Sequence, residues 1–334
     1  MSSTRFSAPV AGFRGHAPRR AAVRSVATSA SSRRPHPRNV AGSLFVDETC
    51  IDCDTCRWMS PDLFRREESQ SVVYRQPDGQ AQEIEAMKAV LSCPTHSIHF
   101  EGSSKDVLHR AHEGLPSPVE GAEGVYHCGW HSEKSYGAAS YLVVRREGNV
   151  LIDSPRYNPI LAKSIERLGG VKHMFLTHQD DVADHDKWAA HFGCSRILHE
   201  ADVRGSTAAV EVQLRGDGPW DLEGNALPAD TDADVQLIFT PGHTRGCVCL
   251  LHAPSASLFT GDHLAFSARL GRLSTFRRYN WFDVELQAQS AAKLADVPFL
   301  NLLPGHGRQH RFADAGERKR MIAAALEEEA AGVY

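Results

Sequence analysis

A cluster of metal-ligand side chains directly follows a short apolar run in the stretch FLTHQDDVADH, residues 175–185. Its candidate ligands are His178, Asp180, Asp181, Asp184 and His185. Imidazole and carboxylate groups that follow a buried strand are typical of a metal site at the edge of a sheet. Three later fragments each place one ligand type after an apolar run: His243 in TPGHTRG, Asp262 in LFTGDH and His306 in LLPGHG. The sequence therefore predicts a metal site assembled from four separate segments.

A second group of candidate ligands consists of four cysteines. Cys50, Cys53 and Cys56 are spaced three residues apart, and Cys93 is followed by a proline. Three thiolates at this spacing converge on one face of an iron-sulfur cluster, and a distant Cys-Pro supplies the fourth. We therefore expect one 4Fe-4S cluster. A structural zinc site is the alternative, although zinc sites more often pair two C-x-x-C units.

The elements that must position these groups divide the chain into parts. Residues 43–102 hold the four cysteines and are expected to form a small α+β module. Residues 103–122 are rich in Gly, Ser and Pro, which predicts a linker. Residues 123–334 alternate strand-like apolar runs with helical segments such as 158–168 and 184–192. This pattern predicts an α/β domain with two sheets flanked by helices.

The first 46 residues contain eight Arg and no Asp, Glu or Lys. This composition predicts a disordered organellar transit peptide over residues 1–40, with a basic disordered tail as the alternative. Loss of residues 1–38, which hold all eight Arg, leaves 29 basic and 41 acidic side chains and a net charge near −12. An acidic surface argues against nucleic acid as a substrate, because phosphate binding needs a basic footprint. We also expect no membrane span, since no run approaches about 18 apolar residues.

The four histidine and aspartate fragments resemble those of the metallo-β-lactamase superfamily, whose fold is an αββα sandwich. Its motifs are THxHxDH after a strand, then PGHTxG, TGD and PGHG. The matching positions of this chain are His178, Asp184, His185, His243, Asp262 and His306. The resemblance implies a first metal held by His178, His243 and residue 180. It implies a second held by Asp184, His185 and His306, with Asp262 bridging the two.

One position departs from the superfamily pattern. Asp180 stands where the superfamily has its second His, and two extra residues separate it from the Asp-His pair. Three interpretations stay open: Asp180, or else Asp181, replaces the His as an oxygen ligand; one metal position is weakened or empty; or the site binds no metal. A carboxylate in place of imidazole favours iron or manganese relative to zinc. One or two metal ions, zinc or iron, are therefore expected.

The cysteine-containing residues 44–101 resemble the single-cluster bacterial-type ferredoxins, in which the second cluster motif is reduced to one Cys-Pro. Fusions of such a ferredoxin to a metallo-β-lactamase domain look like a photosynthetic, plant or cyanobacterial arrangement, which favours the chloroplast over the mitochondrion. Acidic side chains crowd the cysteine loop and suggest docking of a basic redox partner protein, with a solvated surface as the alternative. These side chains are Asp47, Glu48, Asp52, Asp54, Asp62, Glu67 and Glu68.

Two classes of function fit this combination of motifs. The first is a metallo-hydrolase acting on a small-molecule ester or thioester, in which Asp184 orients a metal-generated hydroxide and the cluster transfers electrons, senses redox state or is structural. The second is an oxidoreductase in which the cluster supplies electrons to an iron site acting on oxygen, nitric oxide or a sulfur substrate, as the carboxylate at residue 180 suggests by analogy with flavodiiron proteins. An electron carrier or assembly factor with a degenerate second domain is a third class. The resemblance to the superfamily favours the hydrolase, which is the predicted function.

Overall fold

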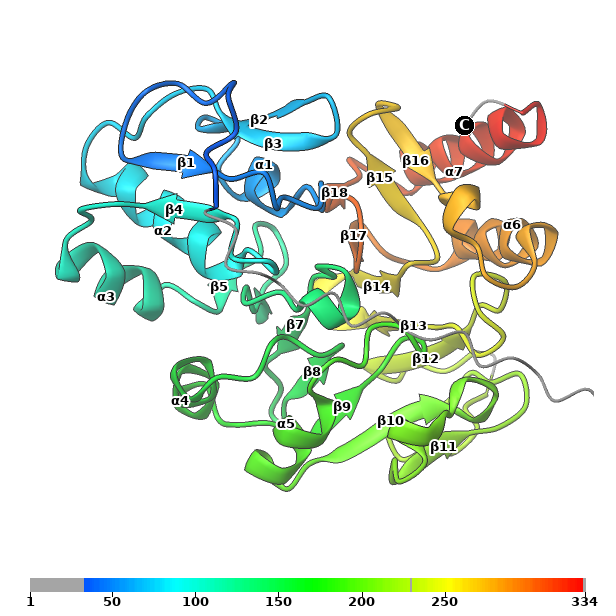
Figure 1. The fold of residues 1–334 in the computed structure, drawn as a ribbon. Helices are drawn as coiled ribbons and strands as arrows, with labels where there is room; N and C mark the ends of the chain where they lie inside the picture. The colour runs from blue at the N-terminus through cyan, green and yellow to red at the C-terminus, as the bar shows by residue number, and fades with distance from the viewer. Residues whose placement is uncertain (1–32, 229, 333–334) are drawn as a thin grey trace, which may run out of the picture. The chain divides into compact units, whose positions relative to one another are not determined.

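Short strands surround two helices in the cysteine-rich module. The computed structural model describes residues 33–228 and 230–332 (Figure 1). The elements of the module are β1 (Leu44–Val46), α1 (Thr55–Met59), β2 (Phe64–Glu67), β3 (Gln70–Val73), α2 (Gln80–Ser92) and β4 (Ile98–Phe100). Strands β1 and β4 pair antiparallel, and β2 and β3 form a hairpin. Buried side chains from all these elements form one small core around the cysteines.

The residues just before β1 are part of this module. The side-chain amide of Asn39 donates to the Val46 carbonyl over 2.7 Å, and its oxygen accepts from the Val73 amide over 2.9 Å. Pro35 forms an isolated bridge with Asp47. The prediction that residues 1–40 are disordered is therefore wrong for residues 33–40, which pack on the module. The rest of the predicted transit peptide, residues 1–32, lies outside the described residues.

The predicted linker is wrong, because residues 103–122 are folded. They contain α3 (Lys105–Glu113), which begins where the Ser104 hydroxyl accepts from the Val107 amide over 3.1 Å. Val107 and Ala111 are buried against Met87 of α2. The segment then adds β5 (Ser117–Pro118) to the edge of a large sheet. The described residues accordingly belong to one compact unit that begins at Arg33.

Two sheets form the centre of the second domain. The first contains, in spatial order, β11 (Val212–Leu214), β10 (Ser195–His199), β9 (His173–Phe175), β8 (Val150–Ile152), β7 (Tyr141–Val143), β6 (Val125–His127) and β5. Strands β5 to β8 are antiparallel, whereas β8 to β11 are parallel. The second contains β12 (Val235–Phe239), β13 (Val248–His252), β14 (Ser257–Gly261), β17 (Asn301–Pro304) and β18 (His310–Arg311). Within the described part of the chain, β14 and β17 pair parallel and the other neighbours of this sheet pair antiparallel.

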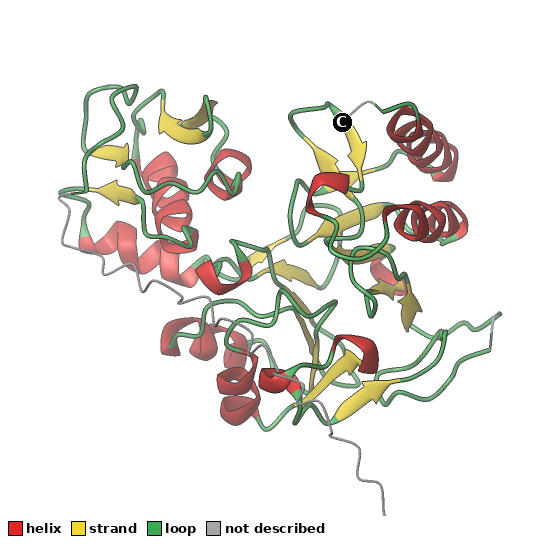
Figure 2. Cartoon of the chain, turned by 45° about the vertical axis from the view of Figure 1, so that its right-hand side comes forward, coloured by secondary structure: helices red, strands yellow, loops and turns green. Residues whose placement is uncertain are grey.

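The two sheets pack face to face with helices outside. One buried cluster joins side chains of both sheets, including Ile152 and Phe175 from the first and Leu250 and Phe259 from the second. On the outer face of the first sheet lie α4 (Pro159–Arg167) and α5 (His185–Phe192), and on that of the second α6 (Val284–Lys293) and α7 (Ala315–Ala330). Figures 1 and 2 show these helices outside the strands. The predicted αββα order of layers is confirmed.

Smaller elements complete the chain. A hairpin of β15 (Ala265–Ser267) and β16 (Arg272–Ser274) follows β14. The short 3₁₀ helices are η1 (Glu133–Ser135), η2 (Glu200–Asp202), η3 (Gly205–Thr207), η4 (Ala253–Ser255), η5 (Arg277–Tyr279) and η6 (Leu294–Asp296). Within the residues that the structure describes, no helix combines the length and apolar character needed to cross a bilayer.

The packing of α3 predicts different effects at neighbouring positions. Val107 is 1% exposed and Leu108 is 37% exposed. Val107→Asp should lower the free energy of unfolding by roughly 2 kcal/mol or more, because it buries an unpaired charge. Leu108→Asp should change it by no more than about 0.5 kcal/mol. Chemical denaturation of both variants measures this difference, and equal small effects would show that α3 does not pack on α2.

Candidate metal and cluster sites

Four strand ends bring the predicted metal ligands together. His178 follows β9 in the first sheet, and His243 follows β12 in the second. Asp262 and His306 follow β14 and β17, which are parallel neighbours, so both residues leave the sheet at the same edge. The site therefore lies where the carboxyl ends of strands from both sheets meet.

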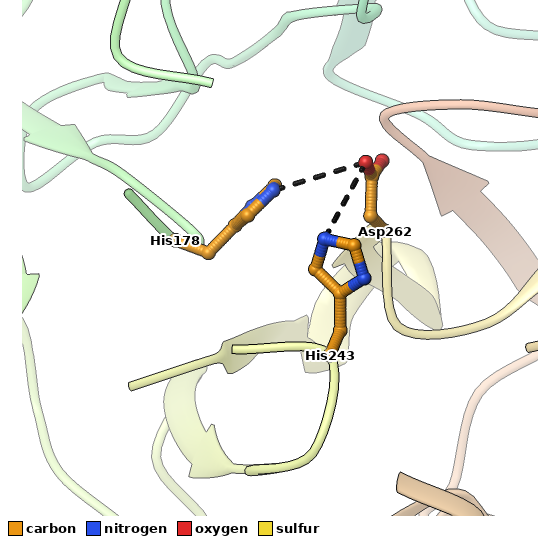
Figure 3. Close-up of side chains that lie close together, drawn as sticks. All are labelled: His178, His243 and Asp262. Atoms are coloured by element: carbon orange, nitrogen blue, oxygen red, sulfur yellow. Dashed lines mark ion pairs between the residues drawn. The ribbon is translucent and has the colours of Figure 1, made fainter. Parts of the chain in front are cut away.

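The first group of ligands surrounds one point. The Nε2 atoms of His178 and His243 each lie 3.8 Å from Asp262 Oδ2 (Figure 3). Both also lie 3.9 Å from Asp180 Oδ2. These distances are too long for hydrogen bonds. They suit ligands of one ion, because two bonds of about 2.0–2.1 Å place two ligand atoms at most about 4.2 Å apart. Asp180 therefore lies where the sequence analysis placed an oxygen ligand.

The second group shares Asp262 with the first. Its other members are Asp181 and His306, and one ligand atom of each of the three lies within 4.8 Å of the others. His306 Nδ1 lies 2.7 Å from Asp262 Oδ1. Gly305 leaves room here, since a Cβ at this position would lie 2.8 Å from Asp181 Oδ2. The geometry thus provides two adjacent positions with one carboxylate between them.

The chemistry of these groups fits metal ions. Four buried atoms have no hydrogen-bond partner among the residues that the structure describes: Nε2 of His178, His243 and His306, and Oδ2 of Asp181. Buried polar atoms in folded proteins are normally paired, so unpaired atoms on four residues grouped around Asp262 need another partner. A divalent cation accepts bonds from imidazole nitrogen and carboxylate oxygen alike. The residues present therefore fit one or two metal ions.

Two predicted ligands lie elsewhere. The Asp184 carboxylate accepts from Lys134 Nζ over 2.7 Å, from Lys187 Nζ over 3.0 Å and from the Tyr157 amide over 3.1 Å. His185 begins α5, and its Nδ1 lies 3.2 Å from Arg196 Nη1. The assignment of Asp184 and His185 to the metal site is corrected accordingly. The two-residue insertion moves this pair into the start of α5, and Asp181 occupies the place assigned to Asp184.

Burial and charge set the protonation of the ligands. Burial lowers the pKa of His178 to about 3, so its imidazole is neutral and able to bind a metal. Burial also lowers the pKa of His306, but the adjacent Asp262 carboxylate outweighs it and raises this pKa to about 10. Burial, followed by the Asp262 charge, raises the pKa of Asp181 well above its usual value. The metal-free second position therefore retains protons that a cation would displace.

A relay of polar groups orients His178. The Asp153 carboxylate accepts from the Thr177 amide over 2.8 Å, and the Thr177 hydroxyl lies 3.0 Å from His178 Nδ1. This contact directs Nε2 of the imidazole toward Asp262, as outer partners of metal-binding histidines generally do. The sequence analysis missed Asp153, although its position directly after the apolar run VLI in β8 was a usable signal.

Asp202 connects the loops that carry the two histidines of the first group. Its carboxylate accepts from the Gln179 amide over 3.1 Å, from the Gly246 amide over 2.8 Å and from the Thr244 hydroxyl. It thereby fixes the loops after β9 and β12 relative to each other. The sequence analysis also missed this residue. Its only signal was a carboxylate shortly after the apolar run of β10.

The four cysteines predicted to hold the cluster line a single cavity. Cys50, Cys53, Cys56 and Cys93 all contribute to its wall. The amides of Ser71 and Ser97 point at Cys50 Sγ over 3.4 Å and at Cys93 Sγ over 3.2 Å. Amide donors of this kind stabilise sulfurs that carry negative charge. The arrangement fits one 4Fe-4S cluster held by these four thiolates.

Most acidic side chains around the cysteine loop already have basic partners within the chain. Asp52 pairs with Arg57 and Arg66, and Asp54 pairs with Arg57 and Arg308. Further pairs join Asp47 to His99, Asp62 to Arg75 and Glu67 to Arg65. These contacts reduce the charge available for docking a basic partner.

A family of known proteins matches the sequence of the N-terminal cysteine-rich module. Residues 46–100 match the family model described as the 4Fe-4S single cluster domain of Ferredoxin I. The match includes all four cysteines that line the cavity. It confirms the prediction of a ferredoxin-like module that holds a single 4Fe-4S cluster.

The chain is also similar to two curated hydrolases. It is 34% identical over 126 residues to the hydroxyacylglutathione hydrolase of Rhodospirillum rubrum, which covers 37% of this chain and 45% of that protein. It is 34% identical over 125 residues to that of Rhizobium etli, covering 36% and 44%. The chain thus spans less than half the length of the curated relatives it matches.

Solved structures with a similar fold include metallo-β-lactamases. The DIM-1 metallo-β-lactamase has a TM-score of 0.46 at 16% identity, covering 62% of this chain and 96% of that chain. The BLEG-1 B3 metallo-β-lactamase has a TM-score of 0.45 at 17% identity, covering 59% and 96%. The αββα architecture described above is derived from the strand order and the packing of the two sheets.

Replacement of Asp181 and of Asp184 should affect metal content differently, because only Asp181 lies among the ligands of the second position. Asp181→Asn should lower the metal content by about one equivalent, because it removes a ligand of the second position. Asp184→Asn should leave the content unchanged, because Asp184 contacts Lys134 and Lys187. Elemental analysis of both purified variants measures the content, and the reverse pattern would restore the original assignment.

The pKa of His306 predicts how metal binding depends on pH. Below about pH 10 the metal-free His306 holds a proton that a metal must displace. Binding at pH 7 should therefore release at least one proton, and affinity should rise about tenfold per pH unit for each proton released. Calorimetry in buffers of different ionisation enthalpy counts these protons. The contribution from His306 should disappear as the pH passes 10, and binding at pH 7 without proton release would contradict the prediction.

Proposed function

We propose that the second domain is a metal-dependent hydrolase that cleaves a small thioester. The observation that carries the proposal is the pair of ligand groups around Asp262, whose unpaired nitrogens and oxygens fit two adjacent ions. A bound pair of ions supplies hydroxide at neutral pH and polarises a carbonyl group. No serine or cysteine nucleophile is required for this chemistry.

The residues of the chain have distinct roles in this proposal. His178 and His243 hold the first position, with Asp180 as an oxygen ligand. Asp181 and His306 hold the second, and Asp262 serves both. Asp181 also takes the orienting role that the sequence analysis gave to Asp184, because it lies in the site whereas Asp184 is held by two lysines.

An aromatic rim beside His243 supports binding of a small organic substrate. The Trp281 amide donates to the His243 carbonyl over 3.1 Å, which places this segment next to the first metal position. Tyr279, Trp281 and Phe282 are exposed there, and the Arg245 guanidinium lies 4.7 Å from the Phe282 ring centre. Such a rim offers apolar contact and one positive charge. The names of the curated relatives support a thioester as the scissile group.

We also propose that the cluster module transfers electrons or senses redox state for this hydrolase. A redox partner protein and a chloroplast location stay part of the proposal. The composition of residues 1–40 supports an organellar destination, and the mitochondrion is the alternative.

An oxidoreductase is the second candidate, and one observation favours it. Asp180 lies 3.9 Å from both imidazoles of the first position, where a carboxylate favours iron over zinc. In this candidate the cluster supplies electrons to an iron site that acts on oxygen, nitric oxide or a sulfur substrate.

Loss of the shared carboxylate tests the hydrolase. Asp262→Asn should lower kcat/KM for S-acylglutathione thioesters by more than about 100-fold, which exceeds the loss typical of outer partners of a metal ligand. Asp296→Asn is the control, because this carboxylate is exposed and pairs only with Lys319 among the described contacts. Chelation should abolish turnover, and zinc should restore it.

Metal analysis of protein purified without oxygen separates the two candidates. The hydrolase predicts zinc-supported turnover. Iron beyond the four atoms of the cluster, together with consumption of oxygen or nitric oxide and no thioester cleavage, would overturn it in favour of the oxidoreductase.

A further inference from the structure

The loop that carries the cluster cysteines contacts the segment that carries His306. Arg308 lies two residues after His306, and its Nε donates to Asp54 Oδ2 over 2.8 Å. Asp54 lies between Cys53 and Cys56 in the cluster loop. The predicted cluster and the candidate metal site are therefore connected by a direct contact between their own loops.

A buried histidine provides a second connection. His131 is 1% exposed, and its Nδ1 lies 2.7 Å from the Gly137 carbonyl and 3.1 Å from the Thr55 hydroxyl. A carbonyl only accepts, so Nδ1 of His131 carries the proton. The same Thr55 hydroxyl lies 3.4 Å from Cys53 Sγ. The His131 imidazole thus contacts both Thr55, which lies next to Cys53, and the Gly137 carbonyl.

The loop at Gly137 contacts both sites. A Cβ at Gly137 would lie 3.0 Å from Cys53 Cβ and 3.4 Å from Cys53 Sγ, so the backbone packs directly on a cluster ligand. The Ala139 amide donates to the Gly305 carbonyl over 2.8 Å. The segment 131–139 therefore touches Cys53 on one side and the His306 loop on the other.

We propose that His131 is a positioning residue that couples the cluster to the second metal position. One-electron reduction by a low-potential donor adds negative charge to the cluster and its sulfurs. Cys53 bound to the cluster is a thiolate without a proton, so the Thr55 hydroxyl donates to its Sγ in that state. The added charge strengthens this hydrogen bond and alters the contact between Thr55 and His131. The change then reaches Gly137 and the backbone beside His306. The proposal rests on the metal site of the proposed function but not on its substrate.

Linkage makes the coupling reciprocal. If reduction of the cluster changes metal affinity, metal binding must change the reduction potential of the cluster by the same factor. We expect a change of about fivefold or more. At about 59 mV per tenfold for one electron, fivefold corresponds to about 41 mV.

The test uses the full chain with its cluster and zinc as the probe metal. Zinc has no redox chemistry, so a shift cannot arise from electron transfer to it. The cluster potential is measured by EPR-monitored titration with and without zinc. Zinc affinity is measured separately with the cluster oxidised and with it reduced by dithionite. Both measurements should give the same factor in the parent protein.

Variants distinguish a positioning role from a structural one. His131→Phe should abolish the shift, whereas His131→Asn should retain it, because the amide keeps an N–H near the position of Nδ1. Thr55→Val removes the hydroxyl at nearly constant volume and should also abolish the shift, which keeps the test available if His131→Phe does not fold. Arg110→Gln is the control, since the Arg110 guanidinium on α3 donates to Gln80 Oε1 over 2.8 Å, and its described contacts involve neither Thr55 nor residues 131–139. It should leave the shift unchanged.

The outcomes separate this proposal from the hydrolase. Absence of a shift in the parent protein, or an unchanged shift in His131→Phe or Thr55→Val, overturns the coupling even if the protein cleaves thioesters. A shift that depends on His131 in a protein without thioesterase activity supports the coupling and overturns the hydrolase. Failure to bind zinc in either redox state overturns both.

Discussion

Repulsion between carboxylates at close range is the constraint on which the C-terminal site depends. Asp180 and Asp262 contact the same two imidazoles, and Asp181 joins Asp262 on the other side. Without a cation, the site balances this charge with protons: the pKa of His306 is raised to about 10, and that of Asp181 is raised well above its usual value. Burying these ionisable groups without a cation costs free energy, and a bound cation would lower this cost. The arrangement is therefore explained by metal ions that share Asp262.

The fold meets this constraint by placing every ligand at a strand end. Two sheets packed face to face bring the ends of β9, β12, β14 and β17 to one edge. Asp153 and Asp202 then hold the loops after β9 and β12 through backbone amides and hydroxyls. The same edge receives the cluster module, whose cysteine loop contacts the segment beside His306. The candidate metal ligands and the cysteine loop thus lie at the same edge of the fold.

Much of this organisation could be predicted from the sequence, for physical reasons. His178, His243, Asp262 and His306 each follow a buried strand, and this position is visible as a polar residue after an apolar run. The helix at α4 was predictable because Asn158 precedes Pro159 and caps it. The sequence could not show whether Asp181 or Asp184 is the metal ligand, because residue spacing does not reveal where the loop ends and α5 begins. The false linker arose because Gly, Ser and Pro flank α3, whereas only tertiary packing buries Val107 and Ala111.

The central claim is that two metal ions share the Asp262 carboxylate. Anomalous diffraction from crystals of the zinc-loaded protein, recorded at the zinc absorption edge, tests it most directly. The account predicts two peaks about 3.5–4 Å apart, one beside His178 and His243 and one beside Asp181 and His306. An ion bound by Asp184 and His185, or no peak within bonding distance of Asp262, would contradict it.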